Sequence, residues 1–112
     1  MVNFTKQRIK VVKGTYGYNI PLQALDEDEN GIDLTGYTCV WVVKDPQGTT
    51  PIFQRLCTSL DITDGKVNAP ITSGDWATGG ITYNAELVAT RTTPAAVRKF
   101  KGLSVRVDDS LV

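Results

Sequence analysis

The sequence predicts an all-β protein, an antiparallel β-sandwich of about seven short strands. Three observations lead to this prediction. Apolar and β-branched residues alternate with polar ones at a period of two, turn residues recur every eight to twelve positions or so, and no stretch shows convincing helical periodicity. The chain has 112 residues, which suits one domain with a single modest core. We therefore expect one domain over residues 1–112, with its core between about residues 8 and 107.

The predicted strands follow one another between turn signals. Gly14 ends the first strand, and the stretch from Asp45 to Gly48 places proline and glycine where a type I or II turn needs them. Asp64-Gly65 is a hairpin signal. The link over residues 72–80 is irregular, with room for a single helical turn, and residues 90–96 form the last loop. The strands themselves are expected at residues 8–13, 18–25, 37–43, 51–57, 66–71, 81–89 and 97–107.

Alternation along these strands assigns the core. Trp41 shares a face with Cys39 and Val43, and we expect this face to be buried. Val40 and Val42 lie on the opposite face although both are β-branched and apolar, so either that face is covered as well or it is an exposed patch that awaits a partner. The same alternation in four strands predicts these core residues: Leu22, Trp41, Tyr83, Leu87 and Val105.

The acidic stretch DEDENGIDLTG, residues 26–36, opens like an EF-hand calcium loop, because Asp26, Asp28, Asn30 and a following glycine match its first ligand positions. The twelfth position should be a bidentate glutamate, and here it is Tyr37. An EF-hand also needs flanking helices, whereas both flanks are predicted strands. We therefore expect a solvated turn, no cofactor and no metal site, with Asp26, Asp28 and Asn30 as weak candidate ligands only.

Composition limits the classes of partner. Twelve basic and twelve acidic residues give a formal net charge of zero, which argues against a bulk nucleic-acid partner. No stretch approaches the roughly eighteen apolar residues of a membrane span. The first eight residues lack the apolar segment of a secretion signal, so synthesis in the cytoplasm without a signal peptide is expected. Cys39 and Cys57 could form one bridge, which spacing alone does not show; in a reducing compartment we expect free thiols.

Basic residues gather in the first and last predicted strands. Lys6, Arg8 and Lys10 lie in or just before the first, and four more lie near the last, at positions 98, 99, 101 and 106. If these strands are neighbours, one edge of the sheet is basic. Lysines there could deter edge-to-edge aggregation, or they could form a docking surface. The interface candidates are therefore Val40, Val42, Lys6, Arg8 and Lys10.

An enzyme is not expected. The chain contains no histidine, which excludes Ser-His-Asp and Cys-His machinery as well as the usual zinc ligand sets. Nearly all acidic residues sit beside glycine, proline or asparagine in predicted turns. Glu86 is the exception, and it alternates outward from Tyr83 and Leu87.

Several short motifs occur in a familiar order. Asp33-Leu34-Thr35-Gly36-Tyr37-Thr38 enters an apolar strand, a DWATGGITYNAEL stretch covers residues 75–87, and Val105-Arg106-Val107 closes the chain. Over residues 9–107 this order resembles the immunoglobulin-like domain of phage baseplate upper proteins and related tail-fibre proteins. The resemblance implies an immunoglobulin-like sandwich in which Leu34 fills the core at the strand entry.

The resemblance also implies a function. A structural virion component is expected, made in the host cytoplasm and then located in the virion, which binds other virion proteins and forms a homo-oligomer, with a trimer and a hexamer as candidate states. The alternative is an immunoglobulin-like carbohydrate-binding or adhesion module. A glycan would need exposed aromatic side chains, and the candidates are Tyr16, Tyr18, Tyr37 and Trp76.

Overall fold

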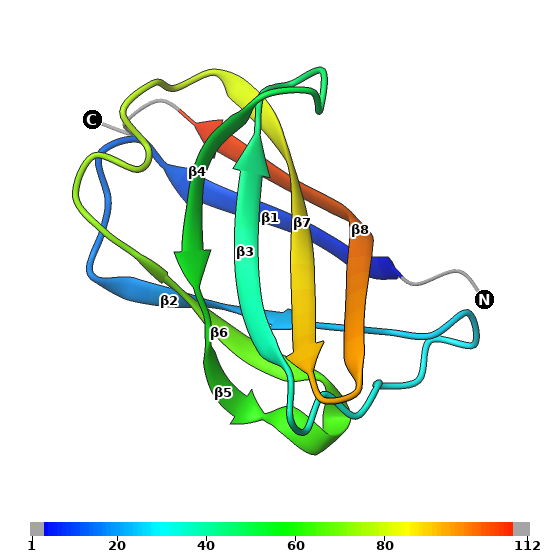
Figure 1. Cartoon of the computed structure of the whole chain (residues 1–112). Coiled ribbons are helices and arrows are strands. Elements are labelled where there is room, and N and C mark those ends of the chain that lie inside the picture. Colours follow the sequence, from blue (N-terminus) through cyan, green and yellow to red (C-terminus); the bar gives the residue numbers. More distant parts are fainter. Residues whose placement is uncertain (1–3, 109–112) are drawn as a thin grey trace.

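A computed structural model of the chain describes residues 4–108, with side chains from residue 8 onward except at position 102 (Figure 1). The described part contains eight strands, one 3-10 turn (η1) and no α-helix. These elements are β1 (Phe4–Val12), β2 (Tyr18–Gln23), β3 (Thr38–Lys44), β4 (Pro51–Leu56), β5 (Thr58–Asp61), η1 (Ile62–Asp64), β6 (Lys66–Ile71), β7 (Ile81–Thr92) and β8 (Ala95–Asp108).

The strands form two sheets. One has five strands in the order β1-β8-β7-β3-β4, and the other has three in the order β2-β6-β5. Neighbouring strands are antiparallel except for β1 and β8, which are parallel. Figure 1 shows β2 and β6 of the three-stranded sheet crossing behind β3, β4 and β7. The protein is therefore all-β and dominated by antiparallel pairing, an arrangement compatible with the predicted β-sandwich.

The core lies between the two sheets and has an aromatic cluster at its centre. Trp41 from β3 and Trp76 from the β6–β7 link are fully buried, with ring centroids 6.0 Å apart. Phe53 from β4 meets both rings edge-on, at 5.8 and 5.4 Å. Such edge-to-face contacts add to the gain from burying large apolar surfaces.

The predicted core residues lie in or against this core. Tyr83 is only half-buried and packs on the edge of the cluster, 6.3 Å from Trp76 between ring centroids. The other five are buried: Leu22, Leu34, Trp41, Leu87 and Val105. In β3, Cys39 and Val43 are buried beside Trp41, as alternation predicts.

The structure also differs from the prediction in particular elements. β5 was not predicted, because all four of its residues are exposed and it carries no alternation to detect. The loop expected at residues 90–96 is shorter, since β7 and β8 extend to Thr92 and Ala95 and leave two residues between them. The helical turn expected in residues 72–80 is absent there. A 3-10 turn lies instead at Ile62–Asp64.

Gly65 lets the segment that links β2 to β3 pack closely against the three-stranded sheet. It is buried, has a φ of 72° and ends η1, so that β5 and β6 pair across it. A Cβ at this position would lie only 2.6 and 2.7 Å from the carbonyl oxygens of Ile32 and Ala24. Glycine is therefore required both by the backbone conformation and by the close approach of the chain that links β2 to β3.

Candidate protein-binding face

The candidate site is the outer face of the five-stranded sheet, the side that points away from the three-stranded sheet. β3 lies inside this sheet, between β7 and β4. Its residues alternate, so that Trp41 points into the core while Val40, Val42 and Lys44 belong to the outer face. What these three side chains meet depends on the register with the neighbouring strands.

Val40 belongs to a row of aliphatic side chains that crosses three strands. It lies opposite Leu56 on β4 and opposite Val88 on β7. Leu56 is 61% exposed, and the two valines are half-buried. We call these three residues the apolar row. Exposed aliphatic side chains that lie together on a sheet face are a feature of protein-binding surfaces.

Val42 lies one step further along β3 and is covered. It faces Gln54 on β4 and Glu86 on β7, and it is only 8% exposed. The two explanations for the paired valines therefore apply to different residues: Val42 is covered by its neighbours, and Val40 is partly open. As an interface candidate, Val42 is weaker than the sequence indicated.

Glu86 is the one buried charged residue in the described part of the chain, at 7% exposure. It points outward, as alternation predicts, but Lys44 covers it with Nζ 3.1 Å from Oε1 of Glu86. A charge removed from water needs such a partner. The burial of Glu86 was not predicted, because Lys44 stands beside it only through the β3–β7 register.

A bulge in the pairing of β7 with β8 lies beside Glu86. Between the pairs Ala85–Leu103 and Leu87–Phe100, β7 contains one residue and β8 contains two. This irregularity leaves a shallow hollow of about 330 Å³ over Glu86, whose rim includes Lys44, Asn84 and Lys101. Bulges often redirect side chains at functional places on a sheet.

The far side of the same face is basic. β1 and β8 are neighbours, with Arg8 opposite Ser104 and Lys10 opposite Arg106. The sequence predicted a basic sheet margin only if these two strands were neighbours. Five exposed cations form what we call the basic margin: Arg8, Lys10, Lys99, Lys101 and Arg106. The side chain of Lys6, the remaining interface candidate, lies outside the described residues.

Only some strands offer backbone edges for pairing with another chain. β8 lies between β1 and β7, so the last strand is interior and not an edge. In this sheet the edges are β1 and β4. An edge-to-edge contact of this sheet would therefore involve either the basic first strand or the strand that carries Leu56.

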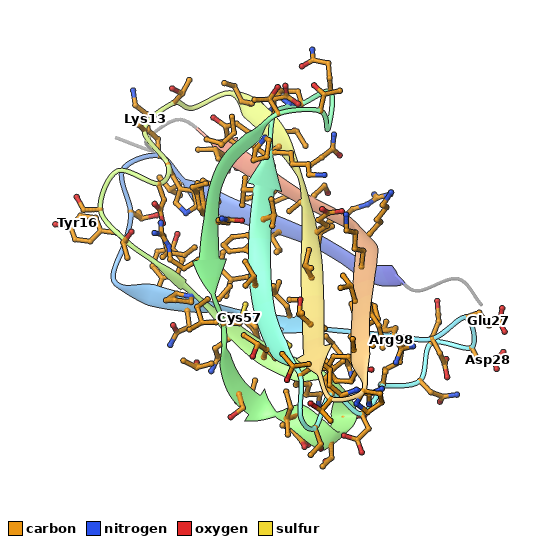
Figure 2. All side chains as sticks on the ribbon, in the orientation of Figure 1. Lys13, Tyr16, Glu27, Asp28, Cys57 and Arg98 are labelled. Atoms are coloured by element: carbon orange, nitrogen blue, oxygen red, sulfur yellow. The ribbon has the colours of Figure 1, made fainter. Side chains whose placement is uncertain are left out.

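The acidic stretch forms a turn at the tip of the link between β2 and β3, which belong to different sheets. Figure 2 shows Glu27 and Asp28 projecting from this tip. Oδ1 of Asp26 accepts hydrogen bonds from the backbone N–H groups of Asp28 and Asn30, both at 2.9 Å. The carboxylate thus closes its own turn, as aspartate commonly does, and the described residues contain no cluster of three metal-ligating side chains.

Calcium in the millimolar range should leave the thermal midpoint of unfolding unchanged. The Asp26 carboxylate is occupied by backbone donors, and the twelfth position is Tyr37, whose ring lies 4.8 Å beneath the guanidinium of Arg91. Thermal unfolding followed by circular dichroism, with calcium and with chelator, tests this expectation. A rise of several degrees with calcium would show that the acidic turn binds the ion.

The two cysteines lie close together near the start of β3. Both are free; Cys39 is buried and Cys57 is half-buried. Burial raises the pKa of the Cys39 thiol. Burial, with a further contribution from the charge that Cys39 would carry, raises the pKa of Cys57 to about 12. Since burial disfavours the thiolate, both groups are protonated near neutral pH and react slowly in the folded protein.

In protein prepared without reductant, both cysteines should react with a thiol reagent after unfolding. Unfolding exposes both groups and returns their pKa values to the ordinary range, so labelling should be much faster than in the folded state. Mass spectrometry of the labelled chain counts the reactive thiols. Labelling that requires prior reduction would mean that the two cysteines are already bridged.

The candidate glycan-binding aromatics do not form a platform. Trp76 is 1% exposed and belongs to the core, so it is not available to stack on a sugar. Tyr16 is exposed in the β1–β2 link, which is hydrogen-bonded through Gly14 to Trp76, shortly before β7 begins, and Tyr18 at the start of β2 is half-buried against the core. Tyr37 precedes β3 beside the opposite end of β7 and stacks with Arg91. These tyrosines therefore belong to different ends of the molecule.

No protein-family model matches the chain, and no curated protein matches it significantly. Within the described residues, no helix has the length and apolar character that crossing a membrane requires.

Proposed function

We propose that the chain is an immunoglobulin-like structural module of a phage virion, which binds other virion proteins, associates with copies of itself and carries out no catalysis. The strand order supports the immunoglobulin-like part. The order β8-β7-β3-β4 corresponds to strands G, F, C and C′ of a variable-type domain, and β2-β6-β5 corresponds to strands B, E and D. Trp41 then takes the place of the buried tryptophan on strand C.

One feature of antibody domains is not shared. Their two sheets are joined by a disulfide between strands B and F, which correspond to β2 and β7. Here Cys39 lies on β3 and Cys57 follows β4. The similarity therefore concerns architecture, and the virion assignment rests on the order of the sequence motifs described above.

The observation that carries the binding role is the composition of the outer face. The apolar row lies toward β4, and the basic margin lies toward β1, on one continuous sheet. Protein interfaces commonly combine an apolar centre with a charged, solvated rim. Because exposed ion pairs contribute about 0–1 kcal/mol each, the apolar row should supply most of the affinity and the charges should set the orientation.

The charge distribution supports association between copies. The chain is neutral overall, yet Glu27 and Asp28 form an exposed acidic tip while the basic margin is exposed on the sheet. Unlike surfaces of two copies can therefore meet in a head-to-tail contact, and such a contact closes into a ring when the rotation between copies permits it.

The solution mass tests this proposal most directly. Light scattering coupled to gel filtration, at protein concentrations from low to high micromolar, should show a symmetric oligomer larger than the monomer. A chain that stays monomeric throughout would contradict self-association. Binding of that monomer to a glycan array would favour the carbohydrate-binding alternative. If the monomer binds neither a second copy nor a glycan, the proposal reduces to docking on a different virion protein, which co-purification tests.

A further inference from the structure

Cys39 on β3 lies opposite Cys57, the residue that directly follows β4. The ladder between these strands ends at the pair Val40–Leu56, and its register, continued by one residue, places Cys39 opposite Cys57. The backbone N–H of Cys57 donates a hydrogen bond to the carbonyl oxygen of Cys39 at 2.9 Å. Directly opposed residues in such a hydrogen-bonded pair have Cα atoms about 5.5 Å apart, which lies within the range of about 4.4–6.8 Å that a disulfide spans.

The two side chains also lie on the same side of the strand pair. Both line one hollow of about 380 Å³, together with Tyr37, Ile62 and Val67. Figure 2 shows Cys57 where β4 passes into β5, beside β3. These are the only cysteines in the chain, so no other thiol of the same molecule competes for either of them.

We propose that Cys39 and Cys57 are a disulfide-forming pair, which is a thiol pair in a reducing environment and closes when the chain meets a small disulfide oxidant such as oxidised glutathione. The inference goes beyond the proposed function and does not depend on it. It requires only that the strand register places the two cysteines directly opposite each other.

The exchange has two steps. Cys57, the half-buried thiol, loses its proton, and its thiolate attacks one sulfur of the oxidant, which forms a mixed disulfide and releases one glutathione thiolate. This first step is slow, because burial raises the pKa of Cys57. Cys39 then loses its proton and attacks the Cys57 sulfur, forming the Cys39–Cys57 bond and releasing the second glutathione. Two protein thiols are oxidised, one glutathione disulfide is reduced to two thiols, and the two protons pass to the released thiolates.

The bond would link the start of β3 to the segment where the chain crosses from one sheet to the other. Cys39 lies at the start of β3 in the five-stranded sheet, and Cys57 lies where the chain leaves that sheet for β5 in the other. Val40 and Leu56, the neighbours of these cysteines, belong to the apolar row. Closing the disulfide would therefore fix the spacing of β3 and β4 beneath the candidate binding face.

The test is a redox titration of the whole chain in glutathione buffers, in the folded state and in urea, with thiols trapped by alkylation and counted by mass spectrometry. We expect an intramolecular disulfide as the main product. The midpoint of the titration is the ratio [GSH]²/[GSSG] at which half of the protein is oxidised. This ratio should be at least tenfold higher for the folded chain than for the chain in urea, because folding holds the thiols together. The oxidised protein should also melt at a temperature higher by about 10 °C.

A matched variant separates proximity from reactivity. Cys57→Ser combined with Thr58→Cys keeps two thiols but moves one to β5, which pairs with β6 and not with β3. It should accumulate the mixed disulfide and form at least tenfold less intramolecular bond than the wild type. A wild-type chain that stops at the mixed disulfide, that forms only intermolecular dimers, or that closes no more readily folded than in urea would overturn the proposal; the comparison with urea holds even if the variant does not fold.

Discussion

Replacing Trp41 with alanine should lower the free energy of unfolding by about 3–5 kcal/mol, the range for truncating a buried large aromatic side chain. Trp41 is completely buried and contacts both Phe53 and Trp76 in the aromatic cluster. The substitution removes the edge-to-face contacts with both rings and leaves a cavity that fully packed neighbours cannot fill. Urea unfolding followed by far-ultraviolet circular dichroism measures the loss.

Two further substitutions act as controls for this prediction. Val40→Ala changes the adjacent residue on the opposite face of β3, where the side chain is half-buried, and should cost about 1 kcal/mol or less. Trp41→Phe should cost less than Trp41→Ala, because it keeps an aromatic ring and removes an indole N–H that is buried without a hydrogen-bond partner. A loss below about 1 kcal/mol for Trp41→Ala would place Trp41 at the surface and invert every assignment of inward and outward residues on β3.

Alternation along single strands was the information that the sequence contained most clearly. It assigned Trp41 and Leu87 to the core because an inward position on a half-buried strand must be apolar whatever strand lies beside it. It failed for β5, whose four exposed residues bury nothing. It placed Tyr83 in the core, but Tyr83 lies at the margin of the aromatic cluster, where the sheet ends and burial is incomplete.

The candidate face depends on the pairing register between strands, which the sequence of one strand does not reveal. Leu56 and Val88 join Val40 only because β4 and β7 pair with β3 in one particular register. The parallel pairing of β1 with β8 likewise brings together segments from the two ends of the chain. Nothing local in either segment specifies such long-range pairings, so the sequence indicated basic strands and an apolar face without showing how they combine.

Under the proposed function, the pair of substitutions Val40→Lys and Leu56→Lys should dissociate the oligomer without unfolding the chain. Two lysines in the apolar row would have to lose their hydration in the interface, with no acidic partner among the residues of that row. Leu56 is the better second position than Val42, because Val42 is covered and a lysine there would threaten the fold itself. We expect the dissociation constant to rise by about a hundredfold, equivalent to about 2.7 kcal/mol.

Leu60→Lys is the matched control, because Leu60 is a similarly exposed leucine, at 54% exposure, but lies on β5 in the other sheet. It should leave the oligomer intact. Analytical ultracentrifugation over a range of concentrations measures both variants, and circular dichroism verifies that each remains folded. An oligomer that tolerates the lysines of the apolar row would place the interface elsewhere, and the exposed backbone edges of β1 and β4 would then be the surfaces to test, since a strand edge can pair with another chain without using the sheet face.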